Sequence, residues 1–296
     1  MTSEQIKTIL SLHKLPVGEI EKCNVGFRNE VWFIGDYVVK LYGKNTSGYA
    51  KELWFYKTAS PSYAPELIAY GENYIILSRI RGEGLYHLWR DMDNTQREAT
   101  VEKIADIACK VNRVSLKGGE SYFNIVPDWK AYMLSRIECD LEELEKINGI
   151  PPFLAEQVRS YMHENSGCLD DKTLYLVYAD LHFDNLIIDK TGKPYLLDYE
   201  MLETAPRDFV LDVWQRMTIH PFTYANEADH ELTLPKDYTY ILSWMRKYAP
   251  ELFDHPRVSE RVNLYGILYE LDILRDYPMG DWPIERMEKY LKGVEW

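Results

Sequence analysis

The sequence predicts an α+β fold in two lobes, with a small antiparallel β-sheet lobe followed by a larger, mainly helical one. Residues 1–80 contain short apolar runs separated by turn residues, which is the pattern of an antiparallel sheet. Beyond residue 81, apolar residues recur mostly at the spacing of an amphipathic helix. We therefore expect an N-terminal lobe of residues 1–80 and a C-terminal lobe of residues 81–296, with the boundary near Ser78–Gly82.

The N-terminal lobe should contain about five strands with one helix inserted among them. Before the strands, Ser3 is a candidate cap for a short first helix. Gly35-Asp36 separates two apolar runs and predicts a hairpin, and residues 71–73 predict another. The helical spacing of residues 47–60 predicts the inserted helix, one side of which would carry Tyr49, Leu53 and Tyr56.

The C-terminal lobe should begin with a long amphipathic helix over residues 95–114. Its apolar stripe would consist of Val101, Ile104, Ala105, Ala108 and Val111. Residues 128–147 and 152–165 also have helical spacing, and the chain is helical and aromatic from about residue 208 to its end. Helices therefore account for most of this lobe.

The charge balance bears on the class of partner. The chain has 34 Lys and Arg against 47 Asp and Glu, which gives a net charge of −13. Because binding to nucleic acid needs a basic surface, this balance disfavours nucleic acid as a partner. It is compatible with a cationic substrate, although acidic surfaces also serve solubility alone.

Cysteine usage and hydropathy predict a soluble, cytoplasmic protein. None of the four cysteines forms a C-x-x-C pair, so we expect free, buried thiols rather than a disulfide framework or a zinc site. The start of the chain lacks the basic segment and long apolar core of a signal peptide. No apolar run reaches the roughly 18 residues that a membrane-spanning helix needs.

Polar residues interrupt an otherwise apolar segment at residues 176–200. Asp180, Asn185 and Asp198 lie among short apolar runs, and residues 190–193 with Gly192 predict a hairpin that ends at Asp198. Ionised carboxylates are costly to bury unless a cation meets them. Phosphoryl transfer uses such a set, with one Asp near the attacking hydroxyl and an Asn and a second Asp holding Mg²⁺.

These residues carry a family resemblance. The segment "YADLHFDN…LLDYE" resembles the "HGDLHxxN…IDWE" signature of the aminoglycoside phosphotransferase and choline kinase family, which has the protein-kinase-like fold. The resemblance implies that Asp180 is the catalytic base, Asn185 a metal ligand and Asp198 the main metal ligand. His182 matches the second His of the signature and is expected to brace the loop.

The resemblance extends to the N-terminal lobe. "VGFRNEVWF" is similar to the family's "GxxNxV" turn over the nucleotide, with Gly26 and Asn29 matching. Lys40 in "YVVKLYG" stands where the family places the lysine that holds the nucleotide phosphates. Glu52, on the following helix, is the candidate ion-pair partner of Lys40, although helix charges are usually surface charges.

Two further segments resemble the family. "IILSRIRG" is similar to the interlobe "LLEYIxG", which implies that Ser78, Arg79 and Ile80 present backbone groups to the adenine ring. "APRDFVLDV" is similar to the "GPxxxDLA" segment after the metal Asp. Asp208 is the preferred match for its structural carboxylate, and Asp212 is the alternative.

Three positions depart from the signature. Tyr178 stands where the family has its first His, Ala179 where it has Gly, and Tyr199 where it has Trp. A non-catalytic kinase-fold binding protein or a spore-coat-like protein is therefore an alternative to an enzyme. Because the remaining chemical residues are intact, we favour an active enzyme. The absence of an A-P-E segment after "LDYE" disfavours a protein kinase.

The predicted function is a small-molecule kinase. With Mg²⁺, it would transfer the γ-phosphate of ATP or GTP to a hydroxyl of an aminoglycoside-like or choline- or ethanolamine-like substrate. Substrate selection would fall to the helices beyond about residue 210. The 23 Tyr and 8 Trp of the chain more often serve core packing, but an aromatic pocket among them could hold a quaternary ammonium. The acidic residues Glu270, Asp272 and Asp276 could instead contact a polyamine, or simply form a solvated helix face.

Overall fold

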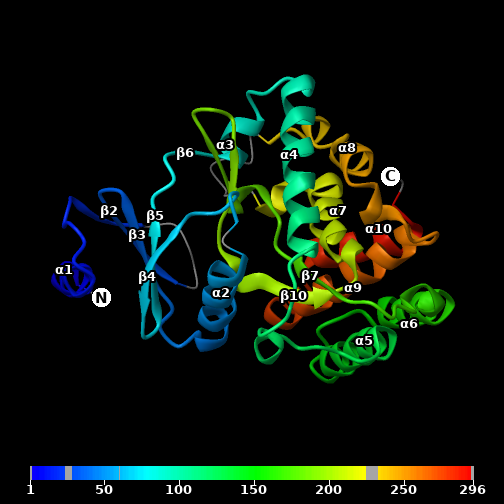
Figure 1. Ribbon diagram of the computed structural model, residues 1–296. Helices are drawn as coiled ribbons and strands as arrows, with labels where there is room; N and C mark the ends of the chain where they lie inside the picture. The colour runs from blue at the N-terminus through cyan, green and yellow to red at the C-terminus, as the bar shows by residue number, and fades with distance from the viewer. Residues whose placement is uncertain (1, 24–28, 60, 225–232, 295–296) are drawn as a thin grey trace. The chain divides into compact units, whose positions relative to one another are not determined.

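The structure is a computed structural model that describes residues 2–23, 29–59, 61–224 and 233–294. Its chain forms two compact units, each assembled from three stretches of sequence (Figure 1). The first unit consists of Met1–Leu88, Leu116–Phe123 and Phe183–Leu202, and the second of Trp89–Ser115, Asn124–His182 and Glu203–Trp296. The assignment of nucleotide binding to residues 1–80 and of catalysis and substrate binding to residues 81–296 remains a prediction.

A five-stranded antiparallel sheet dominates the first unit, as predicted. Its strands follow the order β1-β2-β3-β5-β4. They are β1 (Ile20–Lys22), β2 (Glu30–Ile34), β3 (Tyr37–Leu41), β4 (Leu67–Gly71) and β5 (Tyr74–Ser78). Gly35 and Asn73 adopt left-handed φ angles of 55° and 59° in the tight turns of the two hairpins. Both predicted hairpins are therefore confirmed.

Helix α1 (Ser3–Leu12) packs against the main sheet. The cap is Thr2 and not Ser3: the Thr2 side chain accepts from the Gln5 amide, while the Gln5 side chain accepts from the Thr2 amide. The core cluster that includes this helix consists of Ile6, Ile9, Leu10, Trp32, Ile34, Val39, Leu41 and Ile76. Because side chains alternate along a strand, Lys40 points away from this core, between Val39 and Leu41 in sequence.

Helix α2 (Thr46–Ala59) is the predicted inserted helix, but its buried side differs from the expected one. Its buried residues are Gly48, Glu52, Trp54, Phe55 and Tyr56, whereas Tyr49 and Leu53 are only half-buried. The hydrophobic pattern did not predict that Glu52 would be buried, because its side chain is charged. Glu52 lies on the buried side of the helix because it forms an ion pair with Lys40 there.

A smaller sheet completes the first unit and contains the predicted hairpin near Gly192. It has the order β6-β8-β9, formed by β6 (Gly82–Gly84), β8 (Leu186–Asp189) and β9 (Pro194–Leu196). Gly192 has a φ of 77°, and the Asp189 side chain accepts from the amides of Thr191 and Lys193 within the turn. The Leu196 amide donates to the Tyr63 carbonyl, which joins this sheet to the segment after α2.

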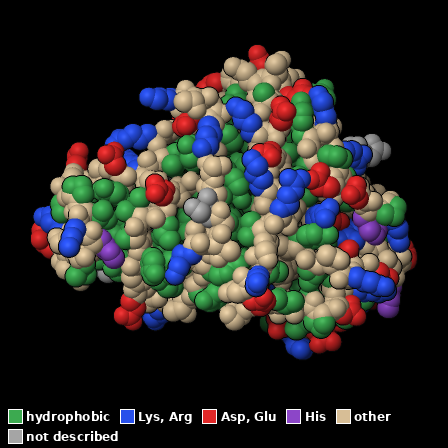
Figure 2. All heavy atoms as spheres, viewed as in Figure 1, with side chains coloured by type: hydrophobic (Ala, Val, Ile, Leu, Met, Phe, Trp, Pro, Cys, Tyr) green, Lys and Arg blue, Asp and Glu red, His purple; other side chains and the backbone are tan. Residues whose placement is uncertain are grey.

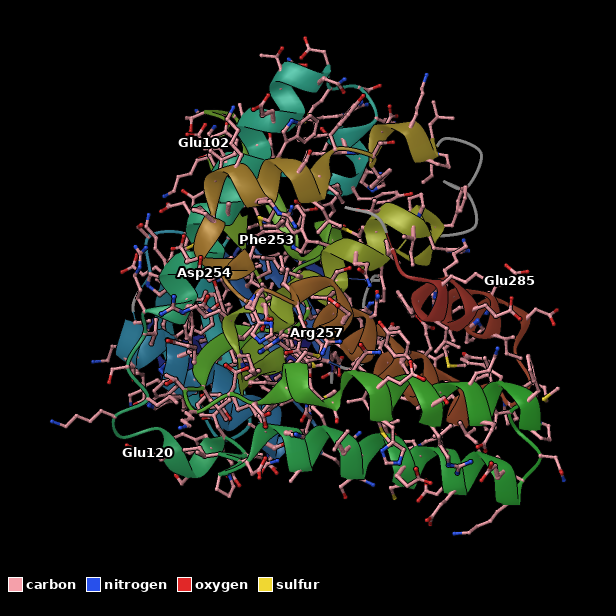
Figure 3. The ribbon with its side chains drawn as sticks, turned by 90° about the vertical axis from the view of Figure 1, so that its right-hand side faces the viewer. Glu102, Glu120, Phe253, Asp254, Arg257 and Glu285 are labelled. Carbon is pink, nitrogen blue, oxygen red and sulfur yellow. The ribbon has the colours of Figure 1, made fainter. Side chains whose placement is uncertain are left out.

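Helices form most of the second unit (Figures 1 and 3). They are α4 (Asn94–Asn112), α5 (Trp129–Lys146), α6 (Pro152–Asn165), α7 (Leu211–Ile219), α8 (Ile241–Tyr248), α9 (Val258–Asp276) and α10 (Asp281–Lys292), while the sequence boundary between the units falls within α3 (Leu85–Trp89). Strand β7 (Tyr175–Tyr178) pairs with β10 (Leu202–Ala205). Every residue of the predicted α4 stripe is buried. Figure 3 labels Glu102 on α4 and Glu285 on α10, both on exposed sides of their helices.

A buried group of charges links three helices of the second unit. This Arg286 cluster consists of Asp212, Arg216, Glu270 and Arg286, all at most 5% exposed. Arg286 lies 2.7 Å from Glu270, and Arg216 lies 2.9 Å from Asp212. Glu270 was expected either to contact a polyamine or to lie on a solvated helix face. Both expectations are wrong for this residue, because its carboxylate is fully buried against Arg286.

Surface features agree with only part of the sequence-based expectations. The described part of the chain contains no helix long and apolar enough to cross a membrane. All four cysteines are free, but Cys139 is exposed and Cys23 half-buried, so the expectation of four buried thiols is wrong for these two. On the face shown in Figure 2, Lys and Arg side chains are interspersed with Asp and Glu.

Candidate active site

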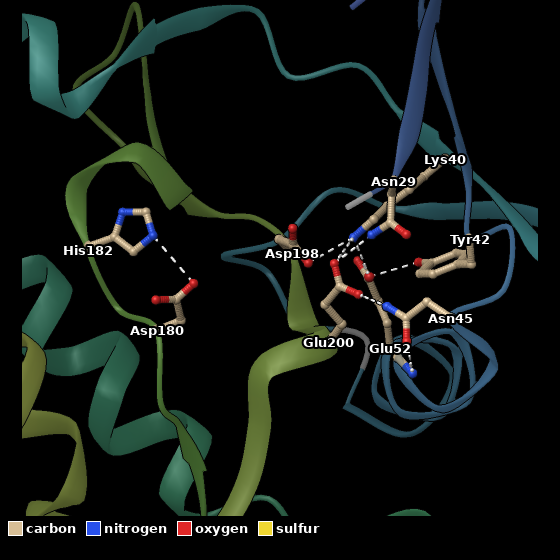
Figure 4. Close-up of polar contacts among 10 residues, drawn as sticks. Asn29, Lys40, Tyr42, Asn45, Glu52, Asp180, His182, Asp198 and Glu200 are labelled. Atoms are coloured by element: carbon tan, nitrogen blue, oxygen red, sulfur yellow. Dashed lines mark hydrogen bonds and ion pairs between the residues drawn. The ribbon is translucent and has the colours of Figure 1, made fainter. Parts of the chain in front are cut away.

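Lys40 lies at the centre of a group of carboxylates in the first unit (Figure 4). Its Nζ atom is 2.6 Å from Glu52 Oε2, 2.8 Å from Asp198 Oδ1 and 3.6 Å from Glu200 Oε1. We call these four residues the Lys40 cluster. Strand β3 supplies the lysine, α2 supplies Glu52, and the segment after β9 supplies the other two carboxylates. The expected ion pair between Lys40 and Glu52 is confirmed.

Burial and charge together set the protonation of this cluster. Burial disfavours the charge of Lys40, but the surrounding carboxylates outweigh burial and raise its pKa. Burial also raises the pKa of Glu200 to about 7, and the neighbouring carboxylate of Asp198 adds to the rise, while Lys40 opposes it. The Tyr42 hydroxyl donates to Glu52 Oε2 at 2.7 Å, which helps to satisfy that buried carboxylate.

Asp198 differs from its two acidic neighbours in exposure and backbone. Its side chain is 40% exposed, against 1% for Glu52 and 4% for Glu200. Its φ of 60° and ψ of 68° lie in the left-handed region, which is unfavourable for a residue other than glycine. Tyr199, which follows it, is fully buried and stacks on Phe55 at a centroid distance of 4.3 Å. This aromatic anchor holds the segment in place and leaves the Asp198 carboxylate partly accessible.

Asn185 lies close to Asp198 through the backbone of the small sheet. The Leu197 amide donates to the Asn185 carbonyl at 2.9 Å, immediately before β8 pairs with β9. The two predicted metal ligands are thus brought to the same end of one hairpin. Their role as ligands remains a prediction.

Asp180 and His182 lie in the second unit, in the loop after β7. His182 Nε2 is 3.3 Å from Asp180 Oδ2, and the side chains are 13% and 35% exposed, respectively (Figure 4). Tyr178, at the first departure from the signature, is 2% exposed and therefore part of the core. The loop presents a half-buried carboxylate next to an imidazole, which is a suitable pairing for a general base.

The predicted nucleotide-binding residues have different environments. The amides of Ser78 and Arg79 already donate to the carbonyls of Glu66 and Asp36, at 2.9 and 2.8 Å. These two backbone donors are therefore engaged within the protein, and a base would have to use other backbone groups of the segment that ends at Ile80. Asn29 donates to Glu200. Gly26 lies outside the described residues.

Comparison with known families decides the class of the protein. The model of the phosphotransferase enzyme family matches residues 19–214. The chain belongs to this family. It is accordingly a phosphotransferase, and the resemblance inferred from the signature is confirmed. A search of curated proteins returned no match.

Solved structures show that this phosphotransferase has the predicted α+β, kinase-like fold. Three similar structures are aminoglycoside phosphotransferase APH(2'')-Ib with ADP, the streptomycin–ATP ternary complex of APH(2'')-IIa, and the GDP complex of aminoglycoside 2'-phosphotransferase-IIIa. They are 16%, 17% and 14% identical to the chain, with TM-scores of 0.67, 0.68 and 0.68. Each alignment covers 99% of this chain, and it covers 97%, 96% and 98% of the respective structures. At these identities the likeness establishes the fold.

The two candidates for the structural carboxylate of the phosphotransferase are both buried and paired. Asp208 Oδ2 lies 2.6 Å from Arg261, and burial raises the pKa of Asp208 to about 6. Asp212 belongs to the Arg286 cluster. The preference for Asp208 remains a prediction.

Sequence reasoning missed Asn45 and Tyr42, which both contact the Lys40 cluster. Asn45 precedes α2 and donates to Glu200, while Tyr42 follows β3 and donates to Glu52. Asn45 could have been identified as a helix cap from the "NTSG" segment, since Asn favours that position. Its second contact had no local signal, because Glu200 is 155 residues away in sequence.

Proposed function

We propose that the protein is a small-molecule kinase that transfers the γ-phosphate of ATP or GTP to a substrate hydroxyl. The Lys40 cluster is the observation that carries this proposal. A buried lysine held by Glu52 and Asp198 is suited to bind nucleotide phosphates, because its ammonium group is kept charged and in place. In this proposal the first unit binds the nucleotide.

Asn185 and Asp198 fit a magnesium ion by their chemistry. Their amide and carboxylate oxygens are hard donors, and Asp198 is the partly exposed carboxylate of the Lys40 cluster. Within the described ranges, no group of three or more His, Cys, Asp or Glu side chains is arranged to hold a metal alone. Magnesium needs only one or two carboxylates, since water and substrate phosphates complete its shell. When bound, Mg²⁺ would neutralise charge on the nucleotide phosphates.

Asp180 is the proposed base. The substrate hydroxyl oxygen forms a bond to the γ-phosphorus, the bond from that phosphorus to the β,γ-bridging oxygen breaks, and the hydroxyl proton passes to the Asp180 carboxylate. The neighbouring His182 would orient the carboxylate through the 3.3 Å contact. Lys40 holds the phosphates of the leaving nucleoside diphosphate.

The substrate class is proposed from charge and fold. The net charge of −13 favours a cationic acceptor by long-range attraction. Among the similar structures, one is a complex with streptomycin and ATP, which supports an aminoglycoside-like acceptor. Choline- and ethanolamine-like alcohols are the second class to test. Another similar structure is a complex with GDP, which supports GTP as well as ATP as a candidate phosphoryl donor.

A second candidate function is non-catalytic binding. Tyr178 and Ala179, which replace the His and Gly of the family signature, motivate it. This candidate predicts binding of Mg²⁺ and nucleotide without turnover of any alcohol.

A substrate panel tests the proposed function. Nucleoside diphosphate release is measured with ATP or GTP, Mg²⁺ and aminoglycosides, amino alcohols or sugars. The Asp180→Asn variant should lower kcat by about 10²–10⁴-fold, because it removes the base. Its unfolding midpoint should remain near that of the wild type, since the side chain is partly exposed. If no acceptor stimulates turnover above the level of Asp180→Asn, the kinase proposal fails and the binding alternative gains support.

A further inference from the structure

We propose that Glu200 is a positioning residue that ties the start of β2 and the N-terminus of α2 to the segment carrying Asp198. In this role it binds two asparagine side chains and is not a metal ligand. The inference rests on the proposed function, since it concerns how the nucleotide-binding residues are held. It assigns separate tasks to two acids that are only two positions apart in sequence.

Both carboxylate oxygens of Glu200 accept hydrogen bonds from asparagine side chains. Asn29 Nδ2 donates to Oε1 at 2.5 Å, and Asn45 Nδ2 donates to Oε2 (Figure 4). Lys40 lies 3.6 Å from Oε1. The three side chains around Glu200 come from β3, from the residue before β2 and from the residue before α2. One carboxylate thus gathers three segments of the first unit.

The direction of the Asn45 amide is fixed by a second contact. Asn45 Oδ1 accepts from the Gly48 amide at 3.0 Å, as a cap does at the start of a helix. The carbonyl side of the amide is therefore used by α2, and the nitrogen side faces Glu200. Because an asparagine amide has one accepting and one donating end, the cap selects a hydrogen-bond acceptor such as carboxylate at position 200.

Gly48 gives independent evidence for this close approach. A Cβ atom added at Gly48 would lie 2.6 Å from Glu200 Oε2 and 2.5 Å from Asn45 Nδ2. Both distances are shorter than van der Waals contact allows. The first turn of α2 therefore needs a residue without a side chain at this position, because Glu200 and Asn45 occupy the space.

Exposure separates Glu200 from Asp198. The Glu200 side chain is 4% exposed, and its two oxygens point to amide donors, whereas the Asp198 side chain is 40% exposed. Mg²⁺ keeps several waters and binds substrate phosphates, which requires an accessible ligand. Asp198 meets that requirement, and Glu200 is placed for internal contacts.

A polarity exchange between positions 200 and 45 tests the proposal in the full-length protein. Glu200→Gln replaces one accepting oxygen by a donor that opposes Asn45. Asn45→Asp keeps the helix cap, because Asp caps as well as Asn, but sets two carboxylates against each other. The double variant Asn45→Asp/Glu200→Gln again pairs one carboxylate with one amide. Glu72→Gln, in the exposed turn between β4 and β5, is the matched control.

Each single variant should raise the KM for ATP about tenfold or more, because a buried hydrogen bond to a charged group is lost. The double variant should return to within about threefold of the wild type, since the pairing is restored in reverse. The Mg²⁺ concentration that gives half-maximal activity should stay within about twofold in Glu200→Gln if Glu200 does not bind the metal.

Three outcomes would overturn the proposal. They are a double variant no better than the singles, a Glu200→Gln variant that matches Glu72→Gln, and a large rise in the Mg²⁺ requirement that the double variant does not reverse. Thermal unfolding without nucleotide provides a readout that does not depend on activity, and the double variant should unfold at a higher temperature than either single. If the wild type neither binds ATP nor turns it over, the proposed function fails, but this unfolding comparison still tests the contact.

Discussion

Each of the two units buries a group of charged side chains, and the two groups differ in the ratio of cations to carboxylates. Among the described residues, the Lys40 cluster has one cation and three carboxylates. The Arg286 cluster has two arginines and two carboxylates, each arginine within 3 Å of an acid. With every acid ionised, the Lys40 cluster has an excess of negative charge, and the Arg286 cluster is neutral within itself.

In the proposed function, this difference separates a binding group from a structural one. A balanced buried group needs no further ion, because its own members offset the cost of removing charge from water. An unequal group with a partly exposed carboxylate gains when a cation arrives, and the metal ion that accompanies a nucleotide is such a cation. Buried charge alone therefore does not mark a functional site, and in the proposed function it is the access of Asp198 to solvent that distinguishes the Lys40 cluster.

The largest expected effect comes from breaking the balanced cluster. Arg286→Met leaves Glu270 as a buried acid without its arginine, which should cost about 3–5 kcal/mol of unfolding free energy. Urea denaturation measures the loss. The double variant Glu270→Leu/Arg286→Met removes both charges and should regain much of the stability. Equal stability of Arg286→Met and the wild type would show that the cluster contributes nothing as a pair.

A somewhat smaller effect concerns pH. Burial raises the pKa of Glu270 from 4.5 to about 7. The folded state therefore binds this proton more tightly than the unfolded state, so stability is greatest below pH 4.5 for this group and falls as pH rises to about 7. At about 1.4 kcal/mol per pKa unit, the loss is at most about 3 kcal/mol.

Urea denaturation at several pH values between 4.5 and 7 tests this dependence. The Glu270→Gln variant should show a flatter decline than the wild type, because its amide does not titrate. Identical slopes for the two proteins would exclude Glu270 as the source.

The smallest expected effect concerns the binding of Mg²⁺, which should depend on the Lys40 cluster and not on the Arg286 cluster. With ATP present, Mg²⁺ at ten times its dissociation constant should stabilise the wild type by about 1.4 kcal/mol. Asp198→Asn should abolish this gain because it removes the exposed carboxylate. Asp212→Asn, in the balanced cluster, should retain it even if the variant is less stable overall. Scanning calorimetry with and without Mg²⁺ measures the difference, and a gain retained in Asp198→Asn would contradict the assignment.

Local patterns predicted the elements that depend on local chemistry. The hairpins at Gly35 and Gly192 and the α4 stripe are confirmed, because turn residues and helical spacing act over a few residues. The order of motifs also selected Lys40 and Glu52 as partners, which the structure pairs. Family resemblance, more than periodicity, made that prediction possible.

Contacts between residues that are far apart in the sequence could not be predicted from local patterns. Hydropathy assigns a charged residue on a helix to solvent, so Glu270 was expected at the surface although Arg286 buries it. For the same reason, Glu52 was not predicted on the buried side of α2. Asn45 has a local reason to cap a helix, and nothing local shows that its other end binds Glu200. Such contacts depend on the tertiary fold.

The three-part construction of the first unit has a consequence for the protein as it is made. Lys40 and Asp198 are 158 residues apart, and the chain between them includes the whole of α4, α5 and α6. At about 5–20 residues per second, a ribosome needs roughly 8–30 seconds to pass from one to the other. During that interval Lys40 and Glu52 have been synthesised and Asp198, the later partner of Lys40, has not. The first unit, for which we propose nucleotide binding, is therefore completed only when the chain up to Leu202 has been synthesised.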